Sequence, residues 1–111
     1  MIDWSRVEEL VEEIGAEDFG EVVELFLDEV ESAIAIFEAG ATDPVIAEEQ
    51  MHFLKGAALN LGFESLAQLC LKGEKAASTG RPEVVSPTDV RETFDSSRIQ
   101  FQADLPGRLA A

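Results

Sequence analysis

Hydrophobic residues recur every three to four positions along most of the chain, and no segment alternates between apolar and polar residues as a strand would. Glycine and proline residues divide this pattern into helical segments. The sequence therefore predicts an all-α protein with five helices and a frayed C-terminal tail. The predicted helices span about 5–14, 17–39, 44–61, 64–78 and 87–105, and the tail spans 106–111.

Capping signals mark the predicted helix boundaries. The four residues from Ser5 have the form of a capping box, and Asp43 supplies an N-cap before Pro44 at the first helical position. Gly62 is a natural left-handed cap for the end of its helix. The segment 79–85 is predicted to be a loop. Because the turn at Gly62 is very short, the helices on either side of it are expected to be antiparallel neighbours.

These helices predict an antiparallel up-down four-helix bundle, with the short N-terminal helix packed across it. The apolar arc of the helix over 17–39 is wider than one bundle contact needs, so part of it is left to receive a partner. Across the turn at Gly62, His52 is expected to lie opposite Lys72, Gly73 and Glu74. Gly73 lies on the apolar side of its helix, where it would let the two helices approach closely.

Composition and charge narrow the functional classes. The 111 residues form one domain, 1–111, with a core large enough to fold unaided. A formal net charge of −15 argues against binding to nucleic acid. It favours a partner with a basic docking face, although solubility is the more general explanation of an acidic surface. The single cysteine, Cys70, excludes an internal disulfide and falls on an apolar helix face, which indicates a core residue.

The cellular location is predicted from two features. No apolar run approaches the ~20 residues that cross a bilayer. The N-terminus is acidic and lacks a basic, hydrophobic signal segment. We therefore expect a cytoplasmic protein that does not contact the membrane.

The only histidine, His52, lies on the predicted helix over 44–61. At 100° per residue, the apolar stripe of this helix is centred opposite His52, so the imidazole is expected to point into solvent. The residues expected to face the core are Ile46, Gln50, Phe53, Leu54, Ala57 and Leu61. The residues expected on the face of His52 are Val45, Glu48, Glu49, Lys55, Gly56 and Leu59.

Two neighbours distinguish His52 from an ordinary surface histidine. Glycine inside a helix costs about 0.8–1 kcal/mol relative to alanine, yet Gly56 follows His52 by one turn and leaves space beside the imidazole. Lys55 places an ammonium group within one turn of the ring, where it would stabilise a dianionic group attached to a ring nitrogen. The pattern indicates a histidine that is available for chemistry.

The segment around His52 resembles the histidine-containing phosphotransfer (HPt) domain family. The family pattern is His, then Lys at the third and Gly at the fourth following position, then small residues and a closing Leu-Gly. The matching residues are His52, Lys55, Gly56, Ala57, Ala58, Leu61 and Gly62. Asn60 and the segment 65–70 are also similar to the family. The resemblance is sharpest over 45–77 and extends over about 5–105.

The resemblance implies a phosphorelay carrier. Neutral His52 would accept a phosphoryl group, through Nε2 as in the family, from an aspartyl phosphate of a response-regulator receiver domain. It would later pass the group to another receiver aspartate. Lys55 would offset the negative charge of the phosphohistidine, and Gly56 would give the receiver steric access. Val45 and Leu59 would form part of an apolar docking rim.

The resemblance also implies the partners. These are receiver domains and a hybrid histidine kinase. The carrier itself is expected to be a monomer without a cofactor, because the partner receiver domain brings Mg²⁺ and the catalytic machinery.

Carboxylates near His52 work against the binding of phosphate. Glu48 and Glu49 favour the imidazolium and repel phosphate, a cost that solvent screens. Family members often carry, on the fourth helix, a polar residue that bonds near the histidine, and the matching position here is Glu74. Its carboxylate would repel a phosphoryl group, orient the imidazole or pair with Lys55, and these roles stay open.

Other functional classes fit the sequence less well. There is no second histidine and no glycine-rich phosphate loop, so we do not expect an enzyme. One histidine and one cysteine cannot supply the three or four soft ligands of a metal site.

Two related alternatives remain. The chain could be a helical interaction module that binds a receiver or a histidine kinase without phosphorylation, although the joint presence of His52, Lys55 and Gly56 argues against this. It could also be the phospho-accepting domain of a chemotaxis-type kinase, which would require attached dimerisation and ATP-binding domains.

Overall fold

The computed structural model describes residues 1–110, with side chains through Leu109. Its five α-helices are α1 (Trp4–Ile14), α2 (Ala16–Gly40), α3 (Pro44–Leu61), α4 (Glu64–Ser78) and α5 (Pro87–Ala110). The described residues contain no strand, and one isolated bridge joins Ile2 to Phe63. The prediction of an all-α protein is confirmed.

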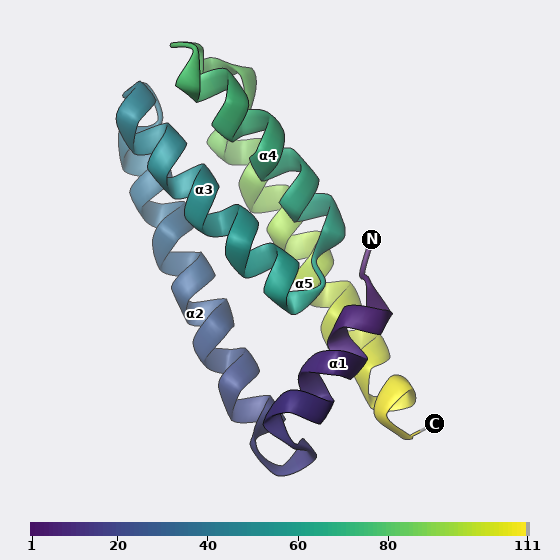
Figure 1. The fold of residues 1–111 in the computed structure, drawn as a ribbon. Coiled ribbons are helices and arrows are strands. Elements are labelled where there is room, and N and C mark those ends of the chain that lie inside the picture. The colour runs from purple at the N-terminus through teal and green to yellow at the C-terminus, as the bar shows by residue number, and fades with distance from the viewer. Residues whose placement is uncertain (111) are drawn as a thin grey trace.

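Helices α2 to α5 run side by side along the length of the molecule, and α1 crosses them near one end (Figure 1). The molecule extends over 45 × 20 × 19 Å. Helix α3 packs against α2 on one side and α4 on the other, and α5 contacts both α2 and α4. This arrangement leaves one long face of α3 in solvent, between its two neighbours (Figure 1).

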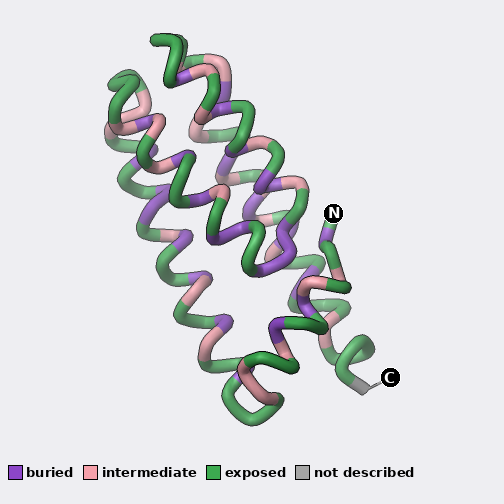
Figure 2. The backbone as a smooth tube through the Cα atoms, viewed as in Figure 1, coloured by how far each residue is buried: buried purple, intermediate pink, exposed green. Residues whose placement is uncertain are grey.

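A hydrophobic core fills the space between the helices, where the buried positions of each helix face inward (Figure 2). Phe63, at the turn between α3 and α4, packs edge-on against Phe101 of α5 with ring centroids 5.5 Å apart. Trp4 of α1 stacks on the same Phe101 ring at 5.9 Å. Such aromatic pairs stabilise a fold by about 0.5–1.5 kcal/mol beyond the area they bury. Cys70 is fully buried in this core, as predicted.

The turn between α3 and α4 sets how the two helices meet. Gly62 caps α3 with a φ of 77°, in the left-handed region that favours glycine. A Cβ at Gly62 would also lie 2.6 Å from the carbonyl oxygen of Asp3, so the approach of the N-terminal segment requires glycine as well. The predicted left-handed cap is therefore confirmed.

Gly73 is the point of closest approach that the sequence predicts between α3 and α4. A Cβ at Gly73 would lie 2.9 Å from Sδ of Met51 on α3 and 3.3 Å from Cβ of Val85. Because Met51 is almost completely buried, it has little freedom to move away. The close approach of the two helices at Gly73 is confirmed.

The start of α1 differs from the prediction. The N-cap is Asp3 and not Ser5, because the Asp3 side chain accepts a hydrogen bond from the backbone N–H of Arg6. The helix therefore begins at Trp4, and the predicted capping box at Ser5 is wrong. Aspartate is as good a cap as serine, and its position two residues earlier lets Trp4 join the helix.

The later boundaries differ as well. The predicted loop over 79–85 contains a short 3-10 helix, η1 (Pro82–Val84). Helix α5 does not end at Leu105 but continues through Pro106 to Ala110. Proline removes one helical N–H donor, but the last turn is also held from outside, because the Arg108 guanidinium lies 4.9 Å from the centre of the Trp4 ring. Residue 111, the end of the predicted frayed tail, lies outside the described residues.

Candidate functional site

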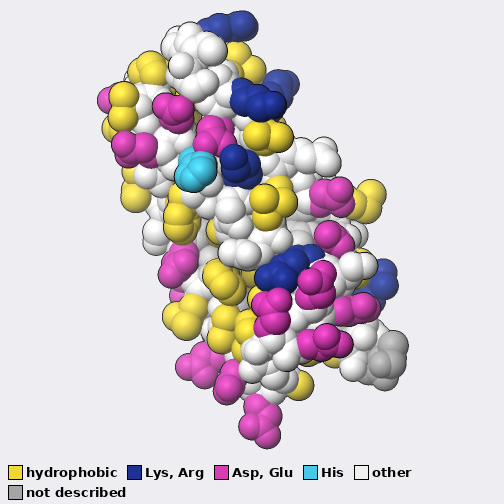
Figure 3. All heavy atoms as spheres, in the orientation of Figure 1, with side chains coloured by type: hydrophobic (Ala, Val, Ile, Leu, Met, Phe, Trp, Pro, Cys, Tyr) yellow, Lys and Arg dark blue, Asp and Glu magenta, His cyan; other side chains and the backbone are white. Residues whose placement is uncertain are grey.

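His52 lies on the solvent-facing side of α3, and its side chain is 71% exposed. Val45 and Leu59 stand seven residues before and after it, and both are exposed. Seven residues make almost two helical turns, so the three side chains share one side of α3. Figure 3 shows the histidine, in cyan, at the surface between acidic and basic side chains.

Glu74 reaches both His52 and Lys55 from the neighbouring helix α4. Its Oε2 lies 2.6 Å from Nδ1 of His52, and its Oε1 accepts a hydrogen bond of 2.5 Å from Nζ of Lys55. The side chain of Glu74 is only 19% exposed, so the carboxylate lies largely beneath the two groups that it joins. The sequence predicts that His52 and Glu74 lie opposite each other across the turn at Gly62. The structure shows that the two side chains are in direct contact.

The surroundings of Glu74 keep its carboxylate ionised. The hydrogen bond from Lys55 lowers the pKa of Glu74 most strongly, the hydrogen bond from His52 acts in the same direction, and burial opposes both. An ionised carboxylate can only accept hydrogen bonds, so Nδ1 of His52 must carry the proton. The lone pair of the neutral imidazole is then on Nε2, the nitrogen that Glu74 does not contact.

Gly56 leaves open space one turn after His52. A Cβ at this position would meet no atom within 4 Å, so packing inside the chain does not require glycine here. A hollow lies beside it on the surface, which we call the His52 hollow. Its lining residues are Phe26, Glu29, His52, Phe53, Gly56, Ala57 and Asn60.

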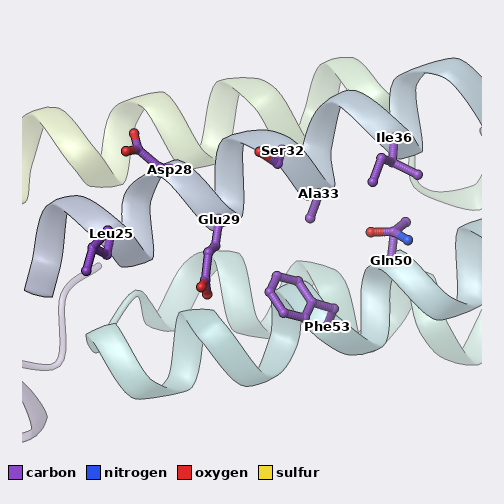
Figure 4. Close-up of a pocket in the computed structure, with 8 residues that line it drawn as sticks. All are labelled: Leu25, Asp28, Glu29, Ser32, Ala33, Ile36, Gln50 and Phe53. Atoms are coloured by element: carbon purple, nitrogen blue, oxygen red, sulfur yellow. The ribbon is translucent and has the colours of Figure 1, made fainter.

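Phe53 corrects the predicted core stripe of α3, because its side chain is 44% exposed. It projects into a groove between α2 and α3, which we call the α2–α3 groove (Figure 4). The groove is lined by Leu25, Asp28, Glu29, Ser32, Ala33, Ile36, Gln50 and Phe53. The wide apolar arc of α2 was the signal for this surface, but a helical wheel does not show how far the neighbouring helix covers it.

A comparison with protein families shows to which family this chain belongs. The sequence model of the family described as Hpt domain matches residues 21–106. The chain belongs to the Hpt domain family. The match covers all of α3 and α4 and most of α2 and α5, which together carry every residue of the site described above.

Membership in the Hpt domain family implies phosphotransfer in two-component relays. Hpt domains are in general phosphocarriers rather than enzymes, and they interact with receiver domains and kinases. Comparisons with curated proteins and with solved structures gave no match.

The described residues of this Hpt domain were also searched for a second nucleophile, a metal site and a membrane-spanning helix. Burial, and secondarily the charge of Glu74, raises the pKa of the Cys70 thiol to about 12, so this thiol is not a nucleophile at neutral pH. Within residues 1–110, no group of three or more His, Cys, Asp or Glu side chains could hold a metal ion. In the same part of the chain, none of the helices has the length and apolar character needed to cross a membrane.

Proposed function

We propose that this Hpt domain is a phosphorelay carrier whose acceptor atom is Nε2 of His52. It takes a phosphoryl group from the aspartyl phosphate of one receiver domain and passes it to the aspartate of another. We also propose that its fold is an antiparallel up-down four-helix bundle with α1 packed across it. One observation carries the proposal: Nδ1–H of His52 donates a hydrogen bond to the ionised Glu74, with 2.6 Å between Nδ1 and Oε2, which leaves the lone pair of an exposed, neutral imidazole on Nε2.

The transfer to His52 is a displacement at phosphorus. The lone pair of Nε2 forms the new N–P bond while the P–O bond to the aspartyl carboxylate breaks, and the carboxylate leaves with the electron pair. The step starts from the neutral imidazole, in which the single proton is on Nδ1 and Nε2 is free. The reverse displacement, with the carboxylate of a second receiver as nucleophile, restores the neutral imidazole.

Glu74 and Lys55 match the charges that this step creates. With phosphorus on Nε2 and hydrogen on Nδ1, the ring carries a positive charge, which Glu74 stabilises through its hydrogen bond. Lys55 offsets the negative charge of Glu74 and so weakens its repulsion of the phosphoryl group. Of the three roles open to Glu74, we therefore propose orientation of the imidazole and pairing with Lys55.

In this proposal, the partner receiver domain supplies the catalytic groups. Mg²⁺ held by the receiver domain would neutralise the phosphoryl oxygens, and this chain would supply only the acceptor, Nε2 of His52. Gly56 gives the receiver room, and Val45 and Leu59 contact it as an apolar rim. The hybrid histidine kinase as a partner, the cytoplasmic location and the monomeric state stay predictions.

The proposal is tested by transfer of a radiolabelled phosphoryl group from a phosphorylated receiver domain in the presence of Mg²⁺. We expect acid-labile, alkali-stable label on the wild-type chain and none on His52→Gln. Because His52 is the only histidine, label that persists in His52→Gln would contradict the assignment. A receiver that binds the wild-type chain tightly but never labels it would support the interaction module instead.

A further inference from the structure

A polar hollow lies where the N-terminal segment and the first turn of α4 meet α5 (Figure 1). We call it the α5 hollow. Its volume is about 320 Å³, at the small end of the range of about 300–1,000 Å³ that is usual for small-molecule sites. None of the residues that line it belongs to α2 or to α3, the helix of His52. Its lining includes Ser65 of α4 and Thr93, Ser96, Ser97 and Gln100 of α5.

The side chains around the α5 hollow indicate which class of ligand it fits. Four of them are hydroxyl groups, and Gln100 adds an amide, so the lining both donates and accepts hydrogen bonds. Met1 and Glu92 complete the lining with an ammonium group and a carboxylate. The carboxylate repels an anion and the ammonium group repels a cation. The hollow therefore favours a neutral molecule with several hydroxyl groups.

Ser97 is the buried polar residue of the α5 hollow, and it is only 3% exposed. It follows Phe94 by three residues and precedes Phe101 by four, so the three side chains lie on the inward side of α5. Both phenylalanines are buried in the core. Within residues 1–110 the Ser97 hydroxyl has no hydrogen-bond partner, and the side chain lines the hollow.

The hydroxyl of Ser97 is costly at this position. A buried hydroxyl without a partner gives up its hydrogen bonds to water and gains none in return. Alanine lacks only this hydroxyl, and it forms helices better than serine. Packing and helix formation thus both favour alanine here. A ligand in the α5 hollow that forms a hydrogen bond with Ser97 offsets the cost.

We propose that the α5 hollow binds a small neutral polyol, a sugar alcohol or a monosaccharide, through hydrogen bonds to Ser97 and the hydroxyl groups around it. Ser97 contacts the deepest hydroxyl of the ligand, because Glu92, Ser96 and Gln100 are exposed and lie at the rim. The inference goes beyond the proposed function and does not depend on it, because the hollow shares no residue with the site around His52.

Titration of the ¹⁵N-labelled full chain with sorbitol, followed by NMR, tests this site. We expect saturable shifts of the amide signals of Ser65, Thr93 and Ser97, with a Kd in the millimolar range. The control ligand is n-propanol, which carries a single hydroxyl group and cannot pair with several lining groups at once. It is expected to give no saturable shift. His52→Gln should bind sorbitol as the wild type does, whether or not His52 is the phosphoryl acceptor.

Two variants test the role of the hollow in different ways. Ser97→Ala is expected to weaken sorbitol binding about three- to tenfold, the usual effect of one lost hydrogen bond, without lowering the midpoint of denaturant unfolding in the absence of sorbitol. Ser96→Tyr places a ring over the hollow from an exposed position, leaves the core unchanged and should abolish binding. The control is Ser5→Ala, which removes an exposed hydroxyl of α1 outside the hollow and should bind sorbitol normally.

Four outcomes would overturn the proposal. The absence of a saturable shift in the wild-type chain would show that the hollow holds only water. Shifted signals that lie outside the α5 hollow would place sorbitol elsewhere. Equal binding of n-propanol would show that the hydroxyl groups do not select the ligand. A lower unfolding midpoint for Ser97→Ala without sorbitol would show that the Ser97 hydroxyl is already paired within the chain.

Discussion

Two glycines in the α3–α4 pair have opposite surroundings. Gly56 follows His52 on the outer face of α3, and a Cβ there would meet no atom within 4 Å. Gly73 precedes Glu74 on the inner face of α4, and a Cβ there would lie 2.9 Å from Sδ of Met51. The first position has free space around it, and the second has none.

The difference separates a glycine that packing requires from one that packing does not require. Each glycine weakens its helix by about 0.8–1 kcal/mol relative to alanine. At Gly73 the missing Cβ lets α4 approach Met51, the residue directly before His52, so that Glu74 can reach the imidazole. At Gly56 no contact within the chain offsets the cost, which is consistent with space kept for a partner.

The largest effect is expected from a valine placed at the inner glycine. Gly73→Val forces Met51 and Val85 to shift and should lower the free energy of unfolding by about 1–3 kcal/mol, the usual cost of overpacking. Gly56→Val is the matched control and should change it by no more than a few tenths of a kcal/mol, about the difference in helix propensity. Denaturant unfolding with unchanged slope measures both. Equal losses in the two variants would remove the contrast between the glycines.

A longer side chain at the outer glycine should affect transfer rather than stability. Gly56→Gln fills the space beside His52 and is expected to slow phosphoryl transfer from a receiver roughly tenfold, about 1.4 kcal/mol in the barrier. Gly20→Gln is the control, because Gly20 is also an open helical position but lines neither the His52 hollow nor the α2–α3 groove. Helix content by circular dichroism should be unchanged in both. Unaltered transfer by Gly56→Gln would end the steric role of Gly56.

A smaller effect is expected at Glu74, which lies between the buried and exposed sides. Glu74→Gln keeps the shape but removes the charge, so Nδ1 loses its ionised acceptor and the ring loses its preferred tautomer. We expect transfer to slow by about three- to tenfold, with a lower Nδ1–H population in the ¹⁵N NMR signals of the His52 ring. Glu21→Gln serves as the control, because Glu21 is an exposed carboxylate on α2 that lines neither the His52 hollow nor the α2–α3 groove. An unchanged tautomer population would contradict the orienting role.

The smallest effect concerns acid stability. Since the pKa of Glu74 in the folded chain lies below its ordinary value of 4.5, the unfolded chain binds this proton first as the pH falls. The stabilising contribution of Glu74 is therefore complete above about pH 4.5 and is lost as the pH drops through its lowered folded-state pKa. The difference in unfolding free energy between the wild type and Glu74→Gln should shrink over this range. A constant difference down to the lowest pH would show that Lys55 and His52 do not stabilise the charge.

Most of the fold could be predicted from the sequence, because helix periodicity and capping act within a few residues. The left-handed helix cap at Gly62 and the core position of Cys70 can be predicted from local patterns alone. The errors arose where a distant segment changes a local rule. Pro106 is an ordinary stop signal, yet α5 continues past it where Arg108 stacks on Trp4 from the other end of the chain.

The candidate site divides in the same way. The outward direction of His52 and its nearness to Lys55 and Gly56 were determined by the sequence itself, because the spacing of residues on one helix sets their angles around its axis. The contact of Glu74 with both His52 and Lys55, and the exposure of Phe53, were decided by the tertiary structure. These depend on how closely one helix approaches another and how far it covers its neighbour, and that distance is set by side-chain packing such as Gly73 against Met51.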